Sequence, residues 1–299
     1  MNAIVVENLV KSYGGFTAVA GVSFEVAAGQ VTALLGPNGA GKTTTIEMLE
    51  GFSVPTGGSV RVLGTDPRKG GRAWRARIGL VFQDTALDSQ LTVAEALKLC
   101  AGLYPDPVPV AEVLDAIDLA GDARTRIGAL SGGQRRRVDL GIAITGRPEM
   151  LFLDEPTTGL DPEARRRLWA VINGLTARGS TVLLTTHYLD EAQHLASRVI
   201  VMSQGRVVAD ATPDELRARG GVPVIRFRPP PGSPALPGEL AAAGHLEGGE
   251  LTLPSQDVTA DLATLVGWAA ACNVDLTGLE VGPPSLEDAY LALTELTHA

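Results

Sequence analysis

The sequence predicts an α/β fold with a largely parallel sheet up to about residue 219, followed by a smaller α+β unit. Before that point, short β-branched runs alternate with helical patterns, as is typical of parallel α/β sheets. The charge balance then changes, because residues 1–219 hold 23 Lys+Arg and 24 Asp+Glu whereas residues 220–299 hold 2 and 10. We therefore expect two domains, 1–219 and 220–299, and the acidity of the second argues against nucleic acid as a partner.

Length and composition narrow the class of protein further. With 299 residues and a hydrophobic share of 45%, the chain can form one large and one small domain. No apolar run approaches the length of a membrane span, and the N-terminus lacks the pattern of a signal peptide. The two cysteines, Cys100 and Cys272, have neither metal-ligand spacing nor a disulfide framework. These features favour a protein of the reducing cytoplasm.

Buried strands are expected to alternate with helices along the first domain. The run "VTALL" leads directly into a glycine-rich loop, and a helix is expected to begin near Lys42. Three later apolar runs each end at a polar residue. Since ligands of open α/β sheets bind at the carboxyl ends of the strands, these ends indicate one shared site. The expected strands are residues 3–10, 22–26, 31–35, 78–82, 150–154 and 180–187, with a closing hairpin around Gly205.

Two helical patterns, residues 92–103 and 110–119, are separated by the breaker "YPDPVP" and belong to a helical subdomain at about residues 84–146. The second domain contains no catalytic or metal-binding pattern, so an accessory role is expected. Its order of elements is compatible with a ferredoxin-like α+β unit. The elements expected there are strand 222–228, a short helix, strand 250–255, helix 257–271, strand 274–281 and helix 285–296.

The segment "GPNGAGKT" fits the phosphate-binding pattern G-x-x-x-x-G-K-[ST] between a strand and a helix. Its glycines let backbone N–H groups face phosphate oxygens at the positive end of a helix. From the glycine, lysine, serine and threonine content, about 0.006 chance matches are expected, which disfavours the alternative of a glycine turn without a ligand. The candidate nucleotide-binding residues here are Gly36, Asn38, Gly39, Gly41, Lys42, Thr43 and Thr44.

Two acids follow the apolar run "MLFL". Asp154 stands where a carboxylate can support Mg²⁺, and the neighbouring Glu155 can orient a water molecule, which is what phosphate hydrolysis requires. The alternative, an acid that caps a helix before a proline, loses weight beside a phosphate loop. Three other residues, Gln83, His187 and Tyr13, are ordinary strand-end residues when taken singly, and gain a role only as members of an ordered set.

The segment "ALSGGQRRR" has the form of a helix start that can hold an anion. Ser131 can cap the helix and act as a ligand, while Gly132 and Gly133 permit close approach of the backbone. The positive end of the helix would then point at a phosphate. The alternative is an ordinary capped helix whose arginines, residues 135–137, form a solvated face.

In their order, these elements resemble the ATP-binding cassette of an ABC transporter. The match covers residues 1 to about 219, and "LSGGQ" between the phosphate loop and "MLFLDEP" is specific to ABC ATPases. The resemblance implies a P-loop NTPase cassette that uses ATP and Mg²⁺ and pairs head to tail with a second cassette. It implies that Thr43 and Gln83 contact Mg²⁺ with support from Asp154, that Glu155 polarises the attacking water and that His187 senses the γ-phosphate. Tyr13 would stack on adenine, Asp161 would lie at the subunit contact, and Ser131, Gly132, Gly133 and Gln134 would cover the ATP of the other chain.

Shorter stretches resemble one branch of the family, the ATP-binding subunits of ABC-2 type exporters of the daunorubicin-resistance kind. They are "KSYGGFTAVAGVSFEV", "TTTIEMLEGF" and "PPSLEDAYLALTEL". This resemblance implies a homodimer on the cytoplasmic face of the membrane that drives a separate permease and exports a drug, an antibiotic or another hydrophobic compound. The permease would dock on the helices at 92–119 and near Gln83.

Two other functions remain open at this point. A soluble ABC ATPase acting on ribosomes or DNA usually carries two cassettes, a coiled-coil insertion or a basic extension, and this chain has none of these patterns. An importer subunit would be distinguished by a neighbouring gene for an extracytoplasmic binding protein.

Overall fold

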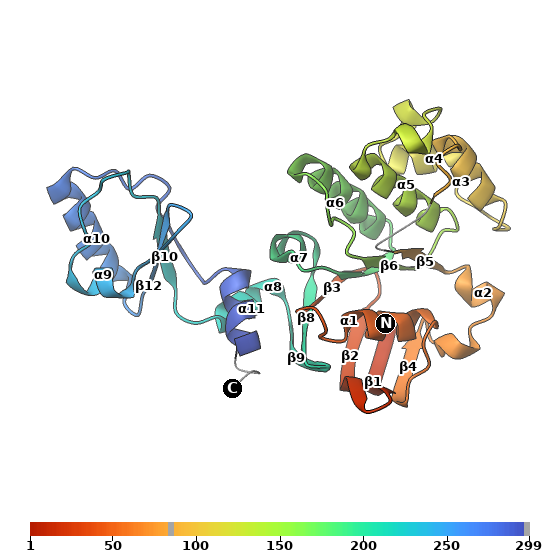
Figure 1. Ribbon diagram of the computed structural model, residues 1–299, viewed down its shortest axis with the longest axis horizontal. Coiled ribbons are helices and arrows are strands. Elements are labelled where there is room, and N and C mark those ends of the chain that lie inside the picture. The colour runs from red at the N-terminus through yellow and green to blue at the C-terminus, as the bar shows by residue number, and fades with distance from the viewer. Residues whose placement is uncertain (83–86, 296–299) are drawn as a thin grey trace. The chain divides into compact units, whose positions relative to one another are not determined.

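The computed structural model describes residues 1–82 and 87–295 (Figure 1). The chain divides into two compact units, Met1–Pro213 and Asp214–Ala299. The expected domain boundary at 219/220 falls at the C-terminal end of helix α8 (Pro213–Arg219), a few residues after this division.

The first unit is built on a six-stranded sheet in the order β5-β6-β7-β3-β8-β9. All neighbouring pairs are parallel except the β8–β9 hairpin, so the predicted α/β class and the closing hairpin are confirmed. The strands are β3 (Val31–Leu35), β5 (Ile78–Val81), β6 (Met150–Asp154), β7 (Thr181–Thr185), β8 (Arg198–Ser203) and β9 (Arg206–Ala211).

The two early strands are longer than predicted and belong to a separate antiparallel sheet. Strand β1 (Asn2–Tyr13) lies between β2 (Phe16–Ala27) and β4 (Gly57–Val62). The sequence did not indicate β4, because it begins with two glycines and has little β-branched character of its own. Strand β4 forms because it pairs with β1, with Val60 opposite Val6, although its own composition favours a strand only weakly.

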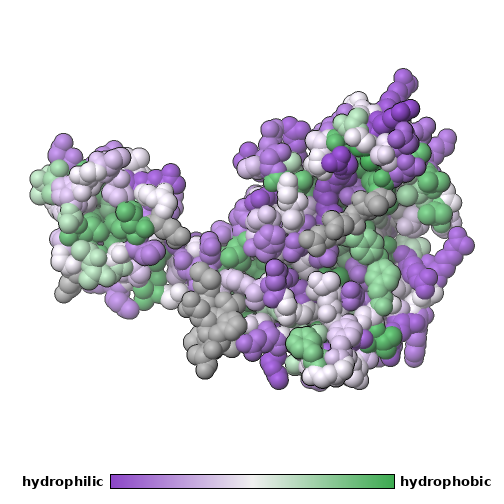
Figure 2. Space-filling view, in the orientation of Figure 1, coloured by the Kyte–Doolittle hydropathy of each residue, from purple (hydrophilic) through white to green (hydrophobic). Residues whose placement is uncertain are grey.

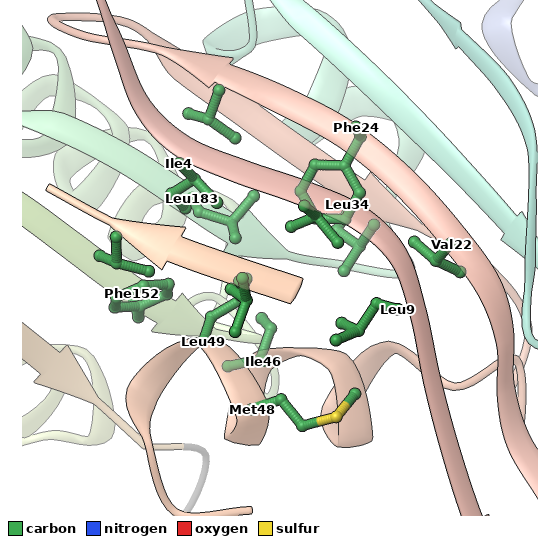
Figure 3. Packing of buried hydrophobic residues seen from close by; sticks show 14 of the residues in the cluster. Ile4, Leu9, Val22, Phe24, Leu34, Ile46, Met48, Leu49, Phe152 and Leu183 are labelled. Carbon is green, nitrogen blue, oxygen red and sulfur yellow. The ribbon is translucent and has the colours of Figure 1, made fainter. Parts of the chain in front are cut away.

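Helix α1 (Lys42–Glu50) contributes to the main core together with side chains from both sheets (Figure 3). Ile46, Met48 and Leu49 of this helix are buried with Phe24 of β2 and Phe152 of β6. Since α1 begins at the end of the glycine loop, this burial anchors the loop at its helical end.

Helices α3 (Val93–Ala101) and α4 (Val110–Ala116) fall within the predicted helical patterns 92–103 and 110–119, and α5 (Gly132–Ile144) begins at the predicted helix start after Ser131. Helix α3 starts with a reciprocal capping box between Thr92 and Glu95. Helices α3, α4 and α5 contact one another. Helices α2 (Arg72–Arg75), α6 (Pro162–Ala177) and α7 (Leu189–Leu195) were not indicated by the sequence. Turns of 3₁₀ helix lie at Pro67–Lys69, Ala120–Asp122 and Ile127–Ala129.

The second unit holds a four-stranded antiparallel sheet in the order β11-β12-β10-β13. With one helix after β10 and one after β12, the connectivity is β-α-β-β-α-β, so the expected ferredoxin-like arrangement is confirmed. The predicted strand 274–281 is shorter, because Asn273 caps α10 in the left-handed region and a turn follows. The elements are β10 (Val224–Phe227), α9 (Gly238–Ala243), β11 (His245–Glu247), β12 (Glu250–Pro254), α10 (Val258–Cys272), β13 (Glu280–Gly282) and α11 (Leu286–Glu295).

Among the described residues, no helix is long and apolar enough to span a bilayer. On the face shown in Figure 2, hydrophobic side chains occur in small groups between hydrophilic ones. Two exposed aromatic rings, Phe52 and Phe82, lie with their centroids 6.0 Å apart.

Candidate functional site

The phosphate loop, the two acids Asp154 and Glu155, and His187 lie at one edge of the parallel sheet. In the strand register, Leu34 of β3 and Asp154 of β6 both pair with Thr185 of β7. The glycine loop after β3, the acids at the end of β6 and the histidine after β7 therefore start from the same edge. This is the edge at which open α/β sheets bind ligands.

The loop between β3 and α1 has the backbone that a phosphate cradle requires. Gly39 and Gly41 have φ angles of 82° and 95°, in the region that favours glycine. A Cβ built on Gly36 would collide with the carbonyl oxygen of Met202, and one on Gly41 would lie 2.5 Å from that of Ala18. Gly41 also caps α1 without any side-chain hydrogen bond, so the positive end of that helix is open to an anion.

Lys42, the first residue of α1, places its ammonium group over the loop itself. Its Nζ donates to the carbonyl oxygens of Gly36 (2.7 Å) and Pro37 (3.2 Å). Burial lowers the pKa of Lys42, and the neighbouring Glu155 and Asp154 act in the opposite direction. Thr43, Asn38 and Gly39 are exposed on the same loop and helix start, and Thr44 is half-buried.

The two acids at the end of β6 differ in how they are held. Thr185 donates its hydroxyl to Asp154 Oδ1, which fixes that carboxylate at the strand end. Glu155 has a φ of 43°, a conformation that costs a non-glycine residue free energy and often marks functional sites. Its backbone N–H bonds to the Thr185 carbonyl and hydroxyl oxygens at 3.2 and 3.0 Å, and its Oε2 accepts from the Thr158 hydroxyl at 3.1 Å.

His187 lies beside Glu155, with its Nδ1 3.4 Å from Glu155 Oε1. The imidazole is half-exposed, and its ring contacts that of Tyr188. Arg165 stacks on the other aromatic ring, 4.3 Å from the Tyr188 centroid, and pairs with Asp190 at 3.0 Å. These contacts hold the segment that carries His187 against α6.

Two acids near the site were not singled out by the sequence. Burial, together with Asp154 and Glu47, raises the pKa of Glu50 to about 8. Glu191, fully buried on α7, accepts a hydrogen bond from Trp169 Nε1 at 3.1 Å, and burial raises its pKa. A glutamate next to apolar residues in a helix gives no signal in the sequence, because only the fold places it near other carboxylates.

Helix α5 begins at the second predicted anion-binding segment. Ser131 is its N-cap and forms a reciprocal capping box with Gln134, whose side-chain amide also donates to Asp122 at 3.0 Å. The two glycines have different surroundings. A Cβ built on Gly133 would lie 2.8 Å from the Cβ of Ala164 on α6, whereas no described atom lies within 4 Å of one built on Gly132. Gly133 thus permits close contact between α5 and α6, and Gly132 stands open at the surface.

The alternative interpretation, in which residues 135–137 form a solvated arginine face, is wrong for two of the three arginines. Arg135 is exposed, but Arg136 and Arg137 are buried, with 9% and 5% of their surface exposed. Arg137 donates to the backbone carbonyl oxygens of Ile117 and Asp118 and pairs with the Asp118 carboxylate at 2.8 Å. The helix turns its second and third arginines inward, where carbonyl oxygens satisfy them.

The remaining predicted residues are placed as follows. Tyr13 ends β1 with half of its surface exposed, and the Lys11 ammonium lies 4.8 Å from its ring centroid. Asp161 is the N-cap of α6 and accepts from the N–H groups of Glu163 and Ala164, and these bonds, that of Ala164 first, lower its pKa. Gln83 lies outside the described residues.

The residues present fit Mg²⁺ held largely by a nucleotide. Over residues 1–82 and 87–295, no three His, Cys, Asp or Glu side chains converge to hold a metal by themselves. The Thr43 hydroxyl and the Asp154 carboxylate are hard oxygen donors, and Mg²⁺ is commonly bound by one or two such side chains together with phosphates and water. Asp154 and Glu47, which add to the effect of burial in raising the pKa of Glu50, also favour a cation here.

A glycine loop between a strand and a helix, with carboxylates at the end of another parallel strand of the same sheet, defines a P-loop nucleotide hydrolase. Residues 19–158 match the family model for ABC transporters, and residues 223–285 match one for the C-terminal domain of ABC-transporter-domain-like proteins. The daunorubicin/doxorubicin resistance ATP-binding protein DrrA of Streptomyces peucetius is 40% identical over 98% of this chain and 92% of its own length. The Nod factor export ATP-binding protein I of Paraburkholderia xenovorans is also 40% identical, over 98% of this chain and 97% of its own.

A solved ATP-binding cassette of an ABC transporter in its ADP conformation superposes with a TM-score of 0.65 at 31% identity, over 72% of this chain and 92% of that one. The chain belongs to the ATP-binding proteins of ABC transporters. The predicted resemblance to the daunorubicin-resistance branch is confirmed. As a member of this family the protein binds nucleotide and is an ATPase subunit of a transporter.

Proposed function

We propose that two copies of this chain pair head to tail around two MgATP and power export through a separate membrane permease. The observation that carries the pairing is the start of helix α5. Ser131 and Gly132 are exposed, and their segment bonds within itself and to Asp122, with no hydrogen bond to the loop 36–41 among the described residues. A helix start that can bind an anion, and that forms no hydrogen bond to the phosphate loop of its own chain, is suited to bind a phosphate held by another molecule.

Within each site the roles follow from position. The loop and Lys42 hold the phosphates, while Thr43 and Asp154, with Gln83 as the sequence predicts, hold Mg²⁺. The metal would neutralise charge on the β- and γ-phosphates. Glu155 orients the attacking water, and His187, beside it, contacts the γ-phosphate. Tyr13 stacks on adenine, and Asp161 lies at the contact between the chains.

A mixing experiment tests the pairing. Lys42→Ala disables the phosphate loop of one chain, and Gly132→Asp places a negative charge where the other chain's phosphate would lie. Neither variant alone should hydrolyse ATP. An equimolar mixture should regain about one quarter of the wild-type rate, because random pairing makes half of the dimers mixed and each mixed dimer keeps one intact site. Gly132 is a suitable position, since an acid in the first turn of a helix is favourable and nothing described lies in its way.

The mixture distinguishes the two possible geometries. If Gly132 served the phosphate loop of its own chain, every site in the mixture would carry a defect and no activity would return. Thermal denaturation of each variant, compared with wild type, shows whether both chains are folded before they are mixed.

Export through a permease is supported by the relatives, whose names describe drug resistance and Nod factor export. We therefore place the protein at the cytoplasmic face of the membrane and assign a drug, an antibiotic or another hydrophobic compound as the cargo. In a drug-sensitive bacterium, co-expression with its permease, to be sought among the membrane proteins of adjacent reading frames, should lower the accumulation of fluorescent daunorubicin. With the Glu155→Gln variant, daunorubicin accumulation should return to the level of cells that carry an empty vector. Equal accumulation with wild-type and variant protein, for daunorubicin and for a panel of hydrophobic antibiotics, would contradict this assignment.

A further inference from the structure

The guanidinium of Arg136 joins the start of helix α5 to the segment that carries both acids of the site. Its Nη2 donates to the carbonyl oxygens of Asp154 (2.7 Å) and Glu155 (3.2 Å), and its Nε donates to that of Pro156 (2.9 Å). Its Nη1 donates to the carbonyl oxygen of Phe82, at the end of β5. One side chain thus holds the carbonyl groups of the last residue of β6, of the two residues after it, and of the residue directly after β5.

We infer that Arg136 is a positioning residue for ATP hydrolysis, which fixes the backbone turn that aims Glu155 and ties this turn to helix α5. The inference rests on the proposed role of Glu155. The hydrogen bonds of Arg136 described above go to backbone carbonyl oxygens, so through them it acts on the position of the two acids and not on their carboxylates directly.

The turn needs such support because Glu155 is held in a costly conformation. Its φ of 43° lies in the left-handed region, which persists in non-glycine residues only where the surroundings fix it. Thr185 holds the N–H side of Glu155 by the two hydrogen bonds described above, and Arg136 holds the carbonyl side. If the carbonyl side were released, the peptide after Glu155 could rotate and the carboxylate would leave its position beside His187.

The arginine fork is suited to this task. A guanidinium presents five N–H donors in a rigid plane, so one side chain can satisfy several carbonyl groups at fixed relative positions. An ammonium has the same charge but places it at a single point. A lysine at this position would keep the charge and the approximate length of the side chain, but it would lose the planar set of donors that reaches several carbonyl groups at once.

Arg136 lies close in the sequence to the start of helix α5, so its hydrogen bonds connect that helix start to the backbone at Glu155. It follows Ser131 by five residues, in the early part of α5, where the helix start faces the partner's nucleotide in the proposed dimer. A shift of this helix start on engaging a phosphate would be carried by Arg136 to the carbonyl groups after β6. Hydrolysis in one site would thereby depend on how the same chain engages the other site.

Arg137 provides a matched control on the same helix. It is equally buried and also donates to backbone carbonyl groups, but its partners are Ile117 and Asp118 at the end of α4. Both arginines stabilise the fold by charge-assisted hydrogen bonds. Only Arg136 reaches the turn that holds Glu155.

The experiment compares Arg136→Lys with Arg137→Lys in the full chain. Both variants should lose similar amounts in melting temperature. Arg136→Lys should also lower kcat about ten- to hundredfold, as expected for a misplaced catalytic group. Its KM for MgATP and its affinity for a fluorescent ATP analogue should stay within about threefold of wild type. Arg137→Lys should leave kcat within about twofold. If Arg136→Lys cannot be purified, Arg136→Gln, whose amide still donates twice, replaces it with the same expectation.

A second comparison tests whether Arg136 acts through Glu155. In a Glu155→Gln background, Arg136→Lys should lower the residual hydrolysis no further, because residues that act as a unit are non-additive. An equal loss of kcat in both arginine variants, an unchanged kcat in Arg136→Lys, or a full further loss in the Glu155→Gln background would each overturn the inference. Wild-type hydrolysis that Lys42→Ala abolishes shows separately that the proposed ATP site itself is correct, whichever way the arginine comparison falls.

Discussion

Replacement of Glu155 by glutamine is expected to lower ATP hydrolysis by about 10²- to 10⁴-fold, the usual contribution of a positioned general base. Glutamine keeps the shape of the side chain and the hydrogen bond from Thr158, but it cannot accept a proton from water. Phosphate release by the purified chain at saturating MgATP measures the loss. ATP should remain bound, since the loop, Lys42 and Thr43 are unchanged.

The same variant should accumulate as a nucleotide-bound dimer. ATP that contacts both chains favours the paired state, and hydrolysis removes that bridge, so a chain that cannot hydrolyse stays paired. Size-exclusion chromatography with light scattering, with and without MgATP, reports the change in mass. A variant that stays monomeric with MgATP would count against the dimer, and one that hydrolyses at the wild-type rate would rule out the role of Glu155.

Glu149→Gln is the control for this experiment. Glu149 immediately precedes β6, at the end of the strand opposite to Glu155, and it forms an ion pair with Arg77 in which both side chains are about half exposed. Such surface pairs contribute about 0–1 kcal/mol to stability. This variant loses the same charge at the far end of the same strand and should hydrolyse ATP normally.

Lys42→Ala is expected to weaken nucleotide binding by about 10²-fold and to abolish measurable hydrolysis. Each charge-assisted hydrogen bond to phosphate contributes about 1.5–3 kcal/mol. Helix α1 contains no second lysine or arginine that could replace Lys42. Loss of the Lys42 ammonium would also remove a positive charge that attracts Asp154 and Glu155, so these two carboxylates would repel the phosphates more strongly. Titration with a fluorescent ATP analogue measures the affinity directly.

The control for Lys42 is Lys98→Ala, on the exposed face of α3. It removes the same charge from the protein, so it separates a local effect at the loop from a change in net charge. Wild-type affinity in Lys42→Ala would show that the phosphates bind elsewhere. A similar loss of affinity in both variants would point to long-range electrostatics instead of a direct bond.

The phosphate loop could be predicted from the sequence because its geometry is local. The glycines that take positive φ angles, the buried strand before them and the helix after them lie within one short stretch, so the pattern of residue types determines the backbone there. The same holds for the capping box at Ser131, whose two partners are three residues apart. The order of strand ends then indicated that Asp154, Glu155 and His187 share one edge.

Other features depended on contacts that no local pattern encodes. The run "RRR" has the composition of a solvated face, yet burial of its last two members depends on carbonyl groups that the fold brings from β5, β6 and α4. Strand β4 pairs through its register on β1 and has weak strand character alone. Position 133 requires a glycine because α6 lies against α5 there, whereas a Cβ at position 132 would meet no described atom.

The sequence by itself determined the class of protein, the phosphate loop and the residues that were candidates for its chemistry, because these depend on residue types at short spacing. Only the tertiary structure decided how those residues are held. It placed Glu50 near Asp154, gave Glu155 its left-handed backbone and set Arg136 against the carbonyl groups beside it. The reason is physical, since burial and hydrogen bonding between distant segments depend on how the sheets and helices lie against one another.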